Sequence, residues 1–99
     1  MGQSLKSARF LVESRLRDAA RGDVDACYDL GIVYSSGAQG VGVDLIEAHK
    51  WFNIAAQAGS RAAQAFRAEI AEDMSAREVA EAQRAARAWL AGTGRRAAA

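Results

Sequence analysis

Two short stretches of this sequence resemble each other: AARGDVDA at residues 19–26 and AAQAGSRAA at residues 55–63. In each, an alanine pair precedes a glycine, and a further alanine follows that glycine by four residues. The alanine pairs are 36 residues apart and the glycines 37, so the second copy carries one extra residue. A repeat of this length has room for two helices and predicts a stack of helical hairpins. Small side chains suit such a stack because they let neighbouring helices approach closely.

The composition favours helices along the whole chain. The 99 residues include no proline, and alanine makes up about a quarter of them. Alanine has the highest helix propensity and proline the lowest. Glycines divide the chain into five segments in which apolar residues recur at intervals of three and four. This pattern predicts helices over residues 4–20, 24–36, 45–58, 61–73 and 76–91.

Residues that cap helices stand at most of these boundaries. Asp23 and Ser60 have the position of N-caps, and Gly22 follows the first helix where a left-handed residue is wanted. The pairs Asp44/Glu47 and Ser75/Glu78 have the spacing of a capping box. Gly31, inside the second helix, costs about 1 kcal/mol relative to alanine, which indicates that another backbone approaches it closely.

The length and charge limit the range of architectures and partners. A chain of 10.5 kDa predicts one domain, here residues 1–91, with residues 75–91 as its capping helix and residues 92–99 as a flexible tail. The net charge of +1 gives no general attraction to nucleic acid or to anionic membranes. No apolar run is long enough to span a bilayer, and no secretory signal is visible, so we expect a cytoplasmic protein.

Residues 19–63 resemble a Sel-one-like repeat, a relative of the tetratricopeptide repeat. The residues that match the family pattern are Leu30-Gly31 and Tyr34, then Gly37 and Gly40-Val41, then Asp44, Ala48, Trp51, Ala55-Ala56 and Gly59. The loop at residues 37–40 carries one residue more than the usual Gly-x-Gly. The resemblance implies an all-α fold, a short solenoid of about five antiparallel helices arranged as tetratricopeptide-like hairpins.

The resemblance also implies a non-enzymatic scaffold or adaptor that holds a protein or peptide in a helix-lined groove. Groove-facing residues off the core stripe of the second helix would be Asp25, Tyr28, Asp29, Ile32 and Ser35. Their two carboxylates predict a basic partner segment. On the other interpretation, Asp23 and Asp25 serve only the helix N-terminus and Tyr28 only packs.

A self-associating structural helical protein without a groove is the alternative function. Barely two repeats leave solenoid faces uncovered, and identical copies of the chain would cover them as a homo-oligomer. Phe10 lies off the apolar stripe of the first helix. It either packs within the stack or forms an exposed contact for a partner or for a second copy.

The sequence offers little support for catalysis or for cofactor, metal or nucleic-acid binding. We expect the single histidine, His49, to face solvent and the single cysteine, Cys27, to pack in the core. Glycines 37, 40 and 42 lack the Lys-Ser/Thr that completes a phosphate-binding loop. Residues 22–59 contain five acidic residues and one basic one, a balance of −4 that repels nucleic-acid phosphate.

Overall fold

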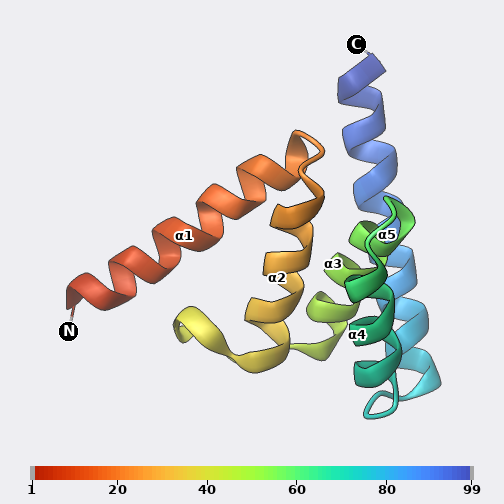
Figure 1. Cartoon of the computed structure of the whole chain (residues 1–99), viewed down its shortest axis with the longest axis horizontal. Helices are drawn as coiled ribbons and strands as arrows, with labels where there is room; N and C mark the ends of the chain where they lie inside the picture. Colours follow the sequence, from red (N-terminus) through yellow and green to blue (C-terminus); the bar gives the residue numbers. More distant parts are fainter. Residues whose placement is uncertain (1, 99) are drawn as a thin grey trace.

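The computed structural model describes the backbone of residues 2–98 and the side chains of residues 9–38 and 40–93, and this part of the chain is helical without strands (Figure 1). The elements in chain order are α1 (Gly2–Ala20), α2 (Val24–Ser36), the short 3-10 helix η1 (Ala38–Gly40), α3 (Leu45–Gln57), α4 (Arg61–Ala71) and α5 (Ala76–Ala98). The predicted all-α fold with packed neighbouring helices is confirmed.

The helix starts follow from local hydrogen bonding. Asp23, Asp44 and Ser60 each accept a hydrogen bond from the backbone N–H three residues later. Ser75 and Glu78 form the full reciprocal capping box at the start of α5. The capping box predicted for Asp44 and Glu47 is only half formed, because the Glu47 carboxylate does not accept from the Asp44 N–H. That carboxylate accepts hydrogen bonds from side chains of the next turn, and the Asp44 N–H donates to a backbone carbonyl of α2.

The two similar stretches form the same turn. Gly22 and Gly59 both have positive φ, 91° and 107°, and the capping residues that follow them, Asp23 and Ser60, have nearly equal φ and ψ angles. Asp23 N–H donates to the Asp18 carbonyl, and Ser60 N–H to the Ala55 carbonyl, at 3.1 and 3.0 Å. Equivalent residues of the two turns are all 37 positions apart. This corrects the prediction from the sequence, a spacing of 36 residues with one residue inserted.

The helix α3 is the centre of the molecule. It packs against α2, α4 and α5, and its buried residues cover most of its circumference. The largest completely buried side chains are Trp51 and Phe52 of α3 and Leu30 of α2. A helix buried on several sides has apolar residues all around rather than along one stripe, and the wide apolar distribution of this segment predicts that arrangement.

The last helix departs from the predicted hairpin array in two ways. First, α5 packs mainly on α3, and its backbone approaches that of its sequence neighbour α4 at few places. Second, α5 continues to Ala98 instead of ending at residue 91, so the tail predicted for residues 92–99 is helical over residues 92–98. The Thr93 hydroxyl donates to the Trp89 carbonyl within the helix, and the Arg95–Ala98 segment has good helix formers, so two glycines do not end it.

The sequence predicts that another backbone approaches Gly31, but in the structure the approaching group is the side chain of Phe52. A Cβ atom at this position would lie 2.5 Å from Cδ1 and Cε1 of Phe52 and 2.8 Å from its Cζ. The Phe52 ring is fully buried and stacks on Phe66, so it has no free space into which to move. Gly31 therefore sets how closely α2 and α3 pack.

We expect Gly31→Ala to lower the free energy of unfolding by about 1–3 kcal/mol, because the added methyl overpacks a filled core. The matched control is Gly92→Ala, where a Cβ would meet nothing within 4 Å. In α5 this change removes the entropic disadvantage of glycine and should add up to about 1 kcal/mol. Urea unfolding of both variants checks this; a neutral Gly92→Ala would mean that residue 92 lies outside a stable helix.

Candidate interaction surfaces

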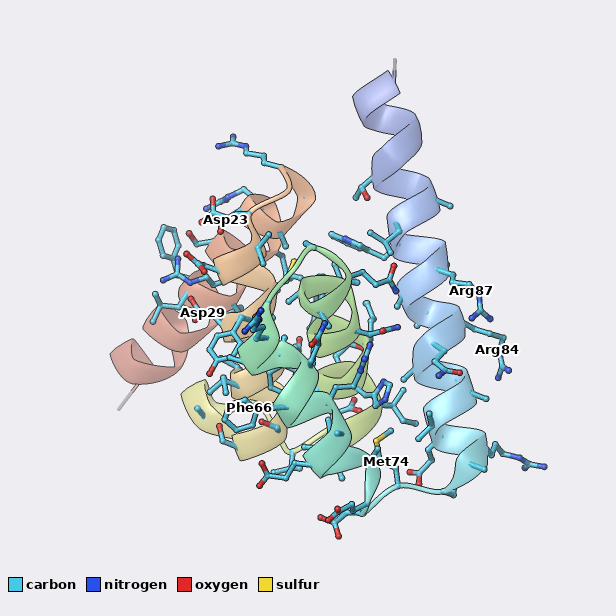
Figure 2. All side chains as sticks on the ribbon, turned by 45° about the vertical axis from the view of Figure 1, so that its right-hand side comes forward. Asp23, Asp29, Phe66, Met74, Arg84 and Arg87 are labelled. Atoms are coloured by element: carbon cyan, nitrogen blue, oxygen red, sulfur yellow. The ribbon has the colours of Figure 1, made fainter. Side chains whose placement is uncertain are left out.

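The five residues predicted to line a groove lie along one stripe of α2. Their spacing puts Asp25, Tyr28, Asp29, Ile32 and Ser35 on neighbouring positions of successive turns. We call this stripe the α2 face. Asp25 is exposed, whereas the other four are half-buried. Figure 2 shows Asp23 and Asp29 on the opposite side of the molecule from Arg84 and Arg87.

Tyr28 connects the α2 face to α4. Its ring centroid is 6.0 Å from those of Phe52 and Phe66, and the latter two rings stack at 5.5 Å. The backbones of α2 and α4 themselves approach at few places, so these three rings provide the main link between the two helices. Tyr28 packs as the simpler interpretation predicted and also remains partly exposed.

Asp29 and Ile32 line a cavity of about 240 Å³ between α1 and α2. The Asp29 carboxylate pairs with the Arg15 guanidinium of α1 at 3.1 Å, and both side chains are more than two-fifths exposed. The pair contributes little to stability at such exposure, and it partly neutralises Asp29. Ser35 donates its hydroxyl to the Ile32 carbonyl. Asp25 thus has the one carboxylate of the α2 face that makes no ion pair among the described side chains.

A larger cavity of about 450 Å³, which the sequence did not indicate, lies at the other end of the domain. We call it the α3–α5 pocket. It lies between the α1–α2 turn, the end of α3 and the second half of α5, and its walls are mainly apolar. Among its lining residues are Val24, Cys27, Ile54, Ala55, Trp89 and Leu90. The lining residues come from four helices and the turn between two of them, so no local pattern could have indicated the pocket.

A polar and aromatic cluster fixes α5 to α3 beside this pocket. The Trp51 and Trp89 rings meet edge to face with centroids 4.8 Å apart. The Glu47 carboxylate accepts hydrogen bonds from the Trp51 indole and from the Lys50 ammonium, at 3.1 and 3.0 Å. Lys50 Nζ lies 4.5 Å from the Trp51 ring centroid, a cation–π contact. The cluster positions Trp89 at the pocket wall.

His49 is buried, which corrects the prediction that it faces solvent. It lies one turn before Phe52 and Asn53, which contact Phe66 and Arg67 of α4, so it belongs to the side of α3 that α4 covers. Only 3% of the residue is exposed, and its Nδ1 has no hydrogen-bond partner among the described atoms. Burial lowers the pKa of His49, and the nearby Arg67 charge lowers it further.

Cys27 is buried, as predicted. Burial raises the pKa of its thiol to about 11, with a smaller contribution from Asp23. A thiol with that pKa has almost no thiolate at neutral pH and is a poor nucleophile. Within the described residues there is no cluster of three or more potential metal ligands. The helices described here also include none long and apolar enough to cross a membrane.

Comparisons with known proteins add no assignment to these surfaces. No protein-family model matches the chain, and neither the curated proteins nor the solved structures gave a match.

We expect His49 to make the fold sensitive to acid. Its pKa in the folded chain lies below that of the unfolded chain, so its neutral form contributes full stability above pH about 6.5. That contribution is lost as the pH falls toward the folded-state pKa. Between pH 7 and 5, the free energy of unfolding should therefore fall more steeply for wild type than for His49→Gln. Parallel urea-denaturation profiles of the two proteins would contradict this.

Proposed function

We propose that the chain is a non-enzymatic protein-interaction module of the Sel-one-like type, whose α2 face binds a basic segment of a protein partner. The observation that carries the proposal is the Asp25 carboxylate. It is exposed and free of ion pairs among the described side chains, and the half-buried apolar surfaces of Tyr28 and Ile32 lie on the same stripe. Aromatic and apolar anchors supply affinity at interfaces, and charges at their edge select the partner.

The charge distribution supports a basic partner. Residues 22–59 carry a net charge of −4, whereas residues 1–21 carry +3 and residues 60–99 carry +2. Arg84 and Arg87 extend from α5 on the side of the molecule opposite Asp23 and Asp29 (Figure 2). Within the acidic part of the chain, Asp25 is the exposed carboxylate of the α2 face that would attract a basic segment.

The identity between the two turns supports the helical-repeat part of the proposal. A unit that starts at Asp23 and ends at Gly59 is followed by the same turn that precedes it. Helical-hairpin repeats stack through such turns and present the first helix of each pair on one side. In this chain those helices are α2 and α4, joined through Tyr28 and Phe66.

A non-enzymatic role is supported by the state of the two most reactive side chains. His49 and Cys27 are both buried, and among the described side chains no hydrogen bond or ion pair links either of them to an activating group. A cytoplasmic location remains a prediction of the sequence. The alternative function, self-association without a groove, is favoured by one observation: Phe10 does not pack within the stack, because 63% of it is exposed.

We expect Asp25→Lys to weaken the binding of a fluorescein-labelled peptide of alternating Lys and Leu about threefold to tenfold at low salt. Fluorescence anisotropy measures the affinity. The matched control is Glu81→Lys, the same charge change on the exposed surface of α5, which should leave the affinity within about twofold of wild type. Equal weakening by both variants, or equal binding of an alternating Glu and Leu peptide, would contradict an acidic site on α2.

A further inference from the structure

Phe10 is an apolar side chain that the fold of one chain leaves uncovered. It lies on the side of α1 opposite Val12 and Leu16, which pack on the core. The N-terminal half of α1 extends away from the other helices (Figure 1). Among the described residues, the Arg17 guanidinium, 6.0 Å from the ring centroid, makes the cation–π contact to this ring. Such a side chain on an extended helix is suited to a contact with another molecule.

The α3–α5 pocket has the size and the lining to take a phenyl ring. A closed cavity of about 150 Å³ already accommodates benzene, and this pocket measures about 450 Å³. Trp89 and Leu90 form one wall and Ile54 another. Edge-to-face and offset contacts with Trp89 would be available to an entering aromatic ring.

Phe10 cannot reach the pocket of its own chain. The pocket begins at Ala19 and Ala20, which lie nine and ten residues further along the same helix. At 1.5 Å per residue, the helix separates Phe10 from the pocket by roughly 14 Å, and Phe10 projects from the side away from the core. Contact between the two therefore requires two molecules.

The ring lies beside charges of both signs: the Arg17 guanidinium contacts it, and Glu13 is the charge that complements the pocket. Glu13 is on the turn next to Phe10, and Arg21 is part of the pocket lining. Both residues are exposed, and neither forms an ion pair with a described side chain. A ring seated in the pocket would carry Glu13 toward Arg21. This match favours a second copy of the chain over an uncharged apolar ligand as the occupant.

We propose that the chain associates with itself by inserting Phe10 of one copy into the α3–α5 pocket of another, with Glu13 of the first copy facing Arg21 of the second. The contact joins two different surfaces of the same molecule, so it is heterologous. It is separate from the α2 face, so failure of either proposal leaves the other standing.

Sedimentation equilibrium over a range of concentrations tests the contact. Wild type should show a mass that rises above 10.5 kDa with concentration. Phe10→Ala should raise the dissociation constant at least about tenfold, the loss typical of a truncated aromatic anchor. The matched control is Val43→Ala, because Val43 is an equally exposed apolar residue, at 62%, outside both surfaces. It should associate as wild type does.

Charge reversal identifies the pocket as the partner surface. Glu13→Arg and Arg21→Glu should each weaken association, and the double variant should restore it toward the wild-type value. Circular dichroism confirms that each variant keeps its helices. A wild-type mass of 10.5 kDa at every concentration, unchanged association of Phe10→Ala, or a double variant no better than the single ones would each overturn the proposal.

Discussion

The structure depends on the need to cover α3. This helix has large apolar side chains on more than one side, and Trp51 and Phe52 are completely buried. One neighbouring helix cannot remove all of that surface from water, so three helices pack around it. The arrangement of α2, α4 and α5 follows from this requirement. It explains why α5 lies on α3 rather than on its sequence neighbour α4, because Trp89 of α5 covers Trp51.

Close packing around α3 in turn requires small residues on its neighbours. Ala26, Ala63, Ala82 and Ala86 are buried on α2, α4 and α5, and Gly31 leaves room for the Phe52 ring. Small residues let the neighbouring helices approach α3 closely, and the Phe52 ring occupies the space that Gly31 leaves. The high alanine content therefore has a packing role in addition to its helix propensity.

The helices and their starts could be predicted from the sequence because the signals are local. Asp23, Ser60 and Ser75 form hydrogen bonds within three residues, and the apolar periodicity is a property of each segment by itself. The end of α5 was predicted wrongly because two glycines were given more weight than the helix formers around them. The environment of His49 was also predicted wrongly, since its burial depends on where α4 crosses α3.

The candidate surfaces show the same division. The stripe on α2 could be predicted from helical spacing, but the Asp29–Arg15 pair and the contact of Tyr28 with α4 depend on tertiary packing. The α3–α5 pocket combines residues from four helices. Its position follows from the angle at which α5 crosses α3, and that angle cannot be predicted from any single segment of the sequence.

The matching turns have a consequence for the length of the molecule. Residues 23–59 begin and end at geometrically equivalent points, with Gly22 before the unit and Gly59 as its last residue. A copy of this segment inserted after Gly59 would have the same turn geometry at both of its junctions. Duplication of the corresponding gene segment would therefore lengthen such a protein by one hairpin at a time, and each added hairpin would be connected by the same type of turn.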